Sequence, residues 1–171
     1  TLHNITIQKA LQMMDSKQLN AFDVSKAPIK ILGEFGGSQF GRGCLAAIQL
    51  IKTGVRCVEV TLDGWDTHLN NHEGHAKLNA VLDPAFAALI RELRARELLD
   101  QTVVICGGEF GRTPKVNSLG GRDHWPKGFS VALAGGGFKG GHVHGATDEF
   151  GYKAMDDLVS CPDLLATVLN Q

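Results

Sequence analysis

The sequence predicts an α/β fold with a mainly parallel sheet flanked by helices. Runs with helical spacing of apolar residues are interspersed along the chain with short apolar runs, in the order helix, strand, helix, strand, strand, helix. The strand-like runs lack polar–apolar alternation, which is typical of strands covered on both faces. The 21 glycines cluster at 33–43, 107–111, 120–121, 135–141 and 145–151. Such clusters are typical of tight loops at strand ends.

The first elements follow from spacing and helix-end signals. Apolar residues at helical spacing predict a helix within 4–22, and residues 23–41, rich in glycine and proline, are expected to form a linker. A second helix is predicted over 41–54, because Gly54 suits a left-handed C-terminal cap. The β-rich run 55–63 follows directly, so we expect a strand there.

The clearest helical stripe runs from residue 73 to residue 100, and Pro84 is expected to divide or kink this helix. Nearly continuous apolar runs then predict buried strands at 102–106 and 129–134. A last amphipathic helix is expected over 162–171.

A single α/β domain is expected over residues 1–171, with an N-terminal helix and linker (1–34) before the core (35–171). The chain begins without an initiator methionine and ends inside a helical pattern. We therefore expect it to be the C-terminal portion of a longer protein and of an incomplete fold.

Charge and hydropathy exclude several partners. The formal net charge is −1, which argues against nucleic acid or an anionic membrane surface as the main partner. Apolar stretches stay well short of the roughly 20 residues that span a bilayer, so no membrane span is expected.

Polar, metal-binding side chains gather in three loops beside the predicted strands. Because ligands bind beyond the carboxyl ends of parallel strands, we expect these loops to form one site. Carboxylates and imidazoles suit Zn, Mn or Fe, and all-oxygen sites suit Mg or Ca. The candidate metal ligands are Asp66, His68, Glu109 and His124, with Asp63 and Asp123 as substitutes or supporting residues.

Two arginines accompany these ligands, at Arg112 and Arg122. A guanidinium group offers fork-shaped donors suited to phosphate, sulfate or carboxylate. We therefore assign both arginines to an anionic substrate, where they would stabilise a charged transition state beside the metal.

Each loop also has an interpretation without a site. Residues 66–68 could cap the following helix, with His72 and His75 solvated on its first turns. Glu109 could form a structural ion pair with Arg112. Three such loops together favour a site.

The third loop and the later histidines have simple alternatives too. Residues 121–125 could be a β-turn in which Trp125 is a core aromatic. We expect His142 and His144 to be exposed loop histidines, although two histidines separated by one residue can bind metal.

Five motifs in collinear order resemble a bacterial family of unknown function, domain-of-unknown-function family 1501, over about residues 35–171. They are FGRGCLAAIQLIKTGVRCVEV, GWDTH, GGEFGRTPKVN, GGRDHWPKGFSVALAGGGFKGG and GATDEFG. The resemblance implies membership of the alkaline phosphatase/sulfatase-like superfamily. It also implies export to the periplasm or beyond, since full-length members often carry a twin-arginine signal.

The superfamily resemblance also assigns ligand positions. Asp63 or Asp66 with His68 would stand for the Asp–His pair after one strand, and His124 for the last ligand. Glu109 would replace an aspartate, and Phe110 would replace a histidine.

The function implied is metal-dependent hydrolysis of phosphate or sulfate esters, acting on a small anionic ester. The expected cofactor is a divalent metal, Zn first, with Mn, Mg or Ca as alternatives. The alternative is a non-catalytic exported binding or structural protein, which Phe110 favours. A third interpretation is a structural zinc, which requires a closed four-ligand shell.

Overall fold

The computed structural model describes residues 2–171, with the backbone alone at residues 17 and 18. The chain forms two compact units. The first unit comprises the chain up to Asp63 together with Asn79–Glu92, and the second comprises Gly64–Leu78 and Leu93–Gln171. The expectation of a single α/β domain over residues 1–171 stays a prediction.

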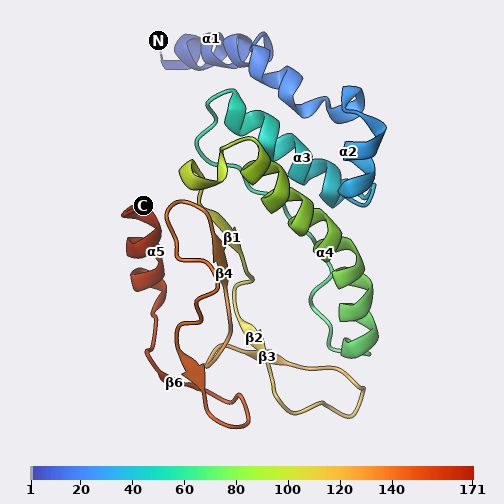
Figure 1. The fold of residues 1–171 in the computed structure, drawn as a ribbon, viewed down its shortest axis with the longest axis vertical. Coiled ribbons are helices and arrows are strands. Elements are labelled where there is room, and N and C mark those ends of the chain that lie inside the picture. Colours follow the sequence, from blue (N-terminus) through green and yellow to red (C-terminus); the bar gives the residue numbers. More distant parts are fainter. Residues whose placement is uncertain (1) are drawn as a thin grey trace. The chain divides into compact units, whose positions relative to one another are not determined.

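The first unit is helical (Figure 1). Its long central helix is α3 (Gln39–Lys52), and the middle of α4 (Asn71–Ala95) also belongs to it. The segment before α3 contains two α-helices and two 3₁₀ turns: α1 (Leu2–Met14), η1 (Lys17–Phe22), η2 (Val24–Lys26) and α2 (Ile29–Glu34). The predicted first helix therefore ends earlier than residue 22. The linker predicted over 23–41 is wrong, because this range contains η2, α2 and the start of α3.

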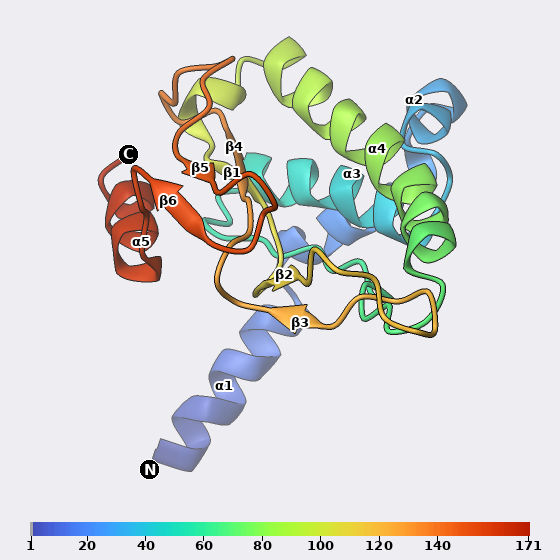
Figure 2. The same cartoon turned by 90° about the horizontal axis from the view of Figure 1, so that it is seen from below.

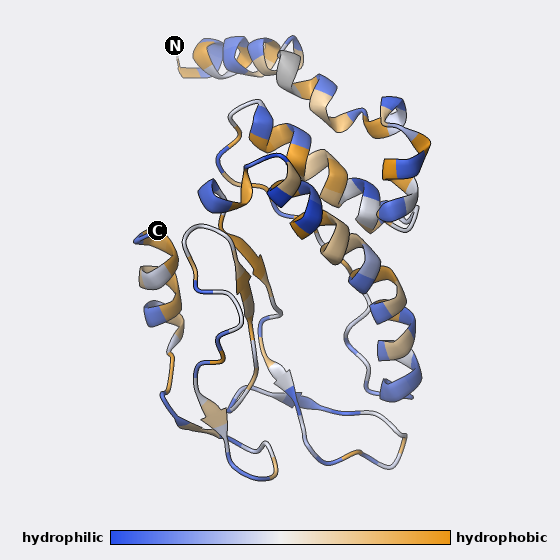
Figure 3. Cartoon of the chain, viewed as in Figure 1, coloured by the Kyte–Doolittle hydropathy of each residue, from blue (hydrophilic) through white to orange (hydrophobic). Residues whose placement is uncertain are grey.

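Local signals define α3. The hydroxyl of Ser38 accepts a hydrogen bond from the Gly41 amide, and Gly54 follows the helix with a φ of 89°. Apolar residues are distributed along α3 (Figure 3), and Ile48 is only 1% exposed, as is Phe35 just before the helix. The predicted helix 41–54 is confirmed, with its cap.

Helix α1 contributes nothing to the core. It has no buried residue, and Figure 2 shows it extending away from α2 and α3. None of the described helices is long and apolar enough to cross a membrane.

Helix α4 is continuous through Pro84, so the expectation that this proline divides the helix was wrong. Ala85 and Ala88 are both 0% exposed. Tight packing of these small side chains holds the turns around Pro84, which offsets the one hydrogen bond that proline cannot donate.

The second unit contains three short antiparallel strand pairs, drawn in yellow to red in Figure 1. β1 (Val104–Cys106) pairs with β4 (Ala132–Ala134), with Val104 opposite Ala134. The other pairs are β2 (Gly111–Arg112) with β3 (His124–Trp125), and β5 (Ala146–Thr147) with β6 (Ala154–Asp156). The 3₁₀ turn η3 (Leu99–Gln101) precedes β1, and α5 (Cys161–Leu169) follows β6.

The two runs predicted as buried strands are strands, but shorter than expected. Val104 in β1 is buried whereas Ile105 is 50% exposed, so β1 is not covered on both faces within the described chain. The pairings among the described residues are antiparallel, and the mainly parallel, alkaline phosphatase-like sheet stays a prediction.

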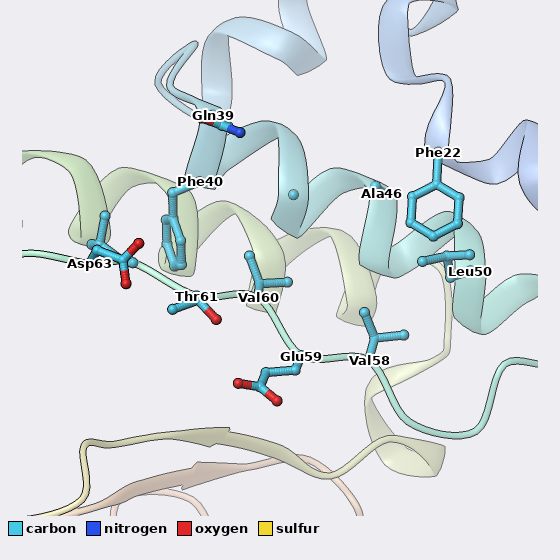
Figure 4. Close-up of a pocket in the computed structure, with 12 residues that line it drawn as sticks. Phe22, Gln39, Phe40, Ala46, Leu50, Val58, Glu59, Val60, Thr61 and Asp63 are labelled. Atoms are coloured by element: carbon cyan, nitrogen blue, oxygen red, sulfur yellow. The ribbon is translucent and has the colours of Figure 1, made fainter.

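The predicted strand at 55–63 is not formed in the described chain. Residues 56–64 make no backbone–backbone hydrogen bond there, and a strand requires a paired neighbour. The segment instead runs extended beside α3, where it lines a cavity of about 520 Å³ together with Phe40 and Leu50 (Figure 4). Val60 faces α3 in this view, and Glu59 points away from it.

Candidate metal centre

Three side-chain atoms converge in the second unit: Oδ1 of Asp66, Nε2 of His68 and Nε2 of His124. The Asp66 oxygen lies 2.9 Å from the His68 nitrogen and 2.8 Å from the His124 nitrogen. The two nitrogens lie 3.2 Å apart. Ligands bound to one ion at about 2.0–2.2 Å lie about 2.8–3.6 Å from each other in tetrahedral or octahedral geometry. The three atoms therefore fit a single divalent cation.

Main-chain bonds bring the two ligand-bearing segments together. The Arg122 amide donates to the Thr67 carbonyl at 3.2 Å, and the Asn71 amide donates to the Gly120 carbonyl at 2.9 Å. At Gly121, a Cβ atom would overlap the carbonyl group of His68, so only glycine permits this approach. The glycine pair at 120–121 thus lets the segment with Asp66 and His68 lie against the one with His124.

Asp123 orients the His68 ring. Its Oδ1 lies 3.2 Å from Nδ1 of His68 and accepts a hydrogen bond from Nδ2 of Asn117, also at 3.2 Å. A carboxylate only accepts, so Nδ1 carries the proton and Nε2 presents its lone pair towards Asp66 and His124. Asp123 is therefore placed to support the candidate centre and is not one of the three converging residues.

Arg112 lies inside the site, with a side chain only 16% exposed. Its Nη2 donates to Oδ1 of Asp66 at 2.7 Å and to the Trp65 carbonyl at 3.0 Å, and its Nη1 donates to the Arg122 carbonyl at 3.2 Å. Among the described residues Arg112 forms its ion pair with Asp66, and the alternative pair with Glu109 is not found there. The other arginine, Arg122, donates to the Thr113 carbonyl at 2.9 Å.

The same contacts keep both carboxylates ionised. Hydrogen bonds from His124 and then Arg112 hold the pKa of Asp66 far below its usual range. Hydrogen bonds from His68 and then Asn117 lower the pKa of Asp123. Near neutral pH the cluster therefore contains two ionised carboxylates, one of them paired with the positive guanidinium of Arg112.

One face of the cluster is open. The side chains of Asp66, His68 and His124 are 68%, 44% and 47% exposed, respectively. On another side, the Phe110 ring packs against His124 with centroids 4.4 Å apart. Three protein ligands with an open face are typical of a catalytic metal site, whereas a structural zinc has four.

Two predicted ligands lie outside the cluster. Glu109 is exposed and is not among the converging residues. Asp63 belongs to the first unit, where it lines the cavity beside α3. No contact in the described chain supports the prediction that Glu109 or Asp63 is a metal ligand.

His72 and His75, which follow His68 in the sequence, differ in their exposure to solvent. His72 is exposed, as expected. His75 is half-buried, so its expected solvation was wrong: it packs edge-on against Trp65 at 5.2 Å, and its Nε2 lies 3.2 Å from Nδ2 of Asn71. Burial first, and then the charges of Arg112 and Arg122, lower its pKa.

Asn117 was missed from the sequence. Its side-chain oxygen accepts from the amides of Leu119 and Gly121 at 3.0 and 2.9 Å, while its amide nitrogen reaches Asp123. An asparagine shortly before a glycine pair is a turn signal that could have identified it.

Comparison with known proteins gives one match. The sequence model of the family described as "Protein of unknown function (DUF1501)" matches residues 2–171. No curated protein and no solved structure matches the chain.

Proposed function

The chain belongs to the DUF1501 family of unknown function, and we propose that it carries the metal centre of an exported, alkaline phosphatase-like hydrolase of phosphate or sulfate esters. The observation that carries the proposal is the convergence of Asp66, His68 and His124 on one point with an open face. The superfamily, the parallel sheet and the location outside the cytoplasm are parts of the same proposal.

Zinc is the metal that the donor set fits best. Two imidazole nitrogens and one carboxylate oxygen suit Zn, with Mn as the next candidate, whereas Mg and Ca favour sites built of oxygen. A divalent cation held there supplies Lewis-acid polarisation of an ester oxygen.

The chain's own residues have distinct roles in this proposal. Asp66 supplies negative charge, and His68 presents Nε2 because Asp123 holds the proton on its other nitrogen. Phe110 shields one side of His124 from water and offers no ligand there. A small anionic ester would approach from the exposed side of Asp66.

Zinc titration calorimetry on the metal-free chain tests the proposal, followed by a panel of phosphate and sulfate esters. We expect one Zn²⁺ per chain, with binding lost in His68→Ala and in His124→Ala. His72→Ala is the matched control, because His72 is exposed nearby and outside the cluster. Absence of zinc binding, or unchanged binding in both cluster variants, overturns the proposal.

A second candidate is a non-catalytic exported protein that binds metal or a partner through the same site. Phe110 favours it, because its ring occupies a side of His124 where a further ligand could lie. Zinc binding without hydrolysis of any ester in the panel would select this candidate. A structural zinc is disfavoured, because the described residues bring only three ligands together.

A further inference from the structure

Arg112 makes contacts that do not fit the substrate-binding role expected from the sequence. We infer that Arg112 is a positioning residue, which holds the carboxylate of Asp66 and joins the two ligand-bearing segments, and that it does not bind the anion of the substrate. This inference rests on the proposed function, since it concerns the same metal centre.

The fork of the guanidinium group reaches both segments at once. Nη2 bonds the carbonyl of Trp65 and the carboxylate of Asp66, which lie on the first segment. Nη1 bonds the carbonyl of Arg122, two residues before the ligand His124. The group is planar and rigid, so these three acceptors are fixed relative to one another.

The backbone of Arg112 adds a second constraint. In the β2–β3 pair, Arg112 lies directly opposite His124. One residue thus fixes His124 through its main chain and Asp66 through its side chain, although these two ligands are 58 positions apart in sequence.

The guanidinium group of Arg112 is largely buried, and most of its N–H donors already have acceptors within the protein, so few are available to a substrate. The Arg112 side chain is 16% exposed, whereas Asp66 is 68% exposed, and three of the five N–H donors of a guanidinium are used. A carboxylate oxygen has more than one lone pair, so Asp66 can accept from Arg112 and still bind a cation.

The test compares Arg112→Ala and Arg112→Lys with Lys115→Ala. Lys115 carries the same charge in the β2–β3 connection, is exposed, and lies outside the group of three converging residues. The readouts are zinc affinity, amide hydrogen exchange of the metal-free chain, and KM against kcat for any ester cleaved at saturating zinc.

We expect Arg112→Ala to lower zinc affinity about 10–100-fold, as the loss of a residue that orients a ligand does. Arg112→Lys should recover part of this affinity, because it restores the charge but not the fork, and Lys115→Ala should bind zinc as the wild type does. Exchange at the Arg122 amide, which donates to Thr67, should accelerate in Arg112→Ala alone.

The outcomes separate this inference from the proposed function. If the wild type binds no zinc while exchange still accelerates in Arg112→Ala, the proposed function fails and the joining of the segments stands. If zinc affinity and exchange are unchanged and KM rises, Arg112 binds substrate and the inference is overturned. Equal loss of zinc affinity in Arg112→Ala and Lys115→Ala also overturns it. If Arg112→Ala does not fold, Arg112→Lys decides by the same readouts.

Discussion

Nδ1 of His68 lies 3.2 Å from Oδ1 of Asp123, although Asp123 adjoins the other histidine of the centre, His124. Each of these neighbours therefore serves a different part of the cluster. Asp123 orients one imidazole, and His124 supplies the second.

Asp123→Asn should weaken zinc binding about 10–100-fold without abolishing it. An asparagine can still contact Nδ1, but it lacks the charge that holds the proton there. Competition with a chromogenic zinc chelator measures the change. Asp100→Asn, an exposed substitution in η3, is the control and should leave affinity unaltered. Wild-type affinity in Asp123→Asn would contradict the role of Asp123.

Gly121→Ala should destabilise the second unit by about 1–3 kcal/mol and weaken zinc binding. The added Cβ meets the carbonyl of His68, so the two ligand-bearing segments must separate. Urea unfolding and zinc titration measure both effects. Gly140→Ala is the matched control, because a Cβ there meets nothing within 4 Å. Equal stability of the two variants would show that the segments do not approach this closely.

The wild-type chain should bind one zinc ion, and Phe110→Ala should leave this stoichiometry at one. Phe110 offers no ligand atom, and the described residues contain one converging group. Elemental analysis after gel filtration counts the ions. A second tightly bound ion, lost in His124→Ala, would show that a further ligand exists.

Helix α5 should lose stability in acid. Hydrogen bonds from the Ser160 side chain and then its backbone lower the pKa of Asp163, so the folded value lies below the unfolded value of about 3.9. The contribution of Asp163 is therefore present above about pH 4 and is lost as pH falls through the lowered pKa. Carbon chemical shifts of residues 161–169 report it, and Asp163→Asn should remove this pH dependence. An unchanged titration in Asp163→Asn would exclude this cap as the cause.

The helices could be predicted where their signals are local. Ser38 and Gly54 mark the two ends of α3 through interactions within a few residues, and the helical spacing of apolar residues between them is visible in the sequence. The conformation of residues 55–63 could not be predicted, because a strand forms only where a neighbouring segment pairs with it, and the sequence of 55–63 does not show whether such a neighbour exists. The continuity of α4 through Pro84 could not be predicted for a similar reason, since it depends on packing around Ala85 and Ala88.

The site was predictable in composition and not in detail. Asp66, His68 and His124 stand in glycine-rich loops, and this concentration selected them. Glu109 had the same signal, but the direction in which a loop side chain points depends on tertiary contacts. The partner of Arg112 depends on such contacts too, since Asp66 lies 46 residues away in sequence.

The extended segment 56–64, which makes no backbone–backbone hydrogen bond in the described chain, leads directly to Asp66. The position of that carboxylate is therefore set by contacts within the second unit, namely the pairing of residues 67–71 with 117–122 and the bonds of Arg112 to Trp65 and Asp66. A chain break within 56–62, by a protease or by circular permutation, removes none of the hydrogen bonds described at the candidate metal centre. Such a nicked chain would show how far the second unit holds its ligands in place by itself.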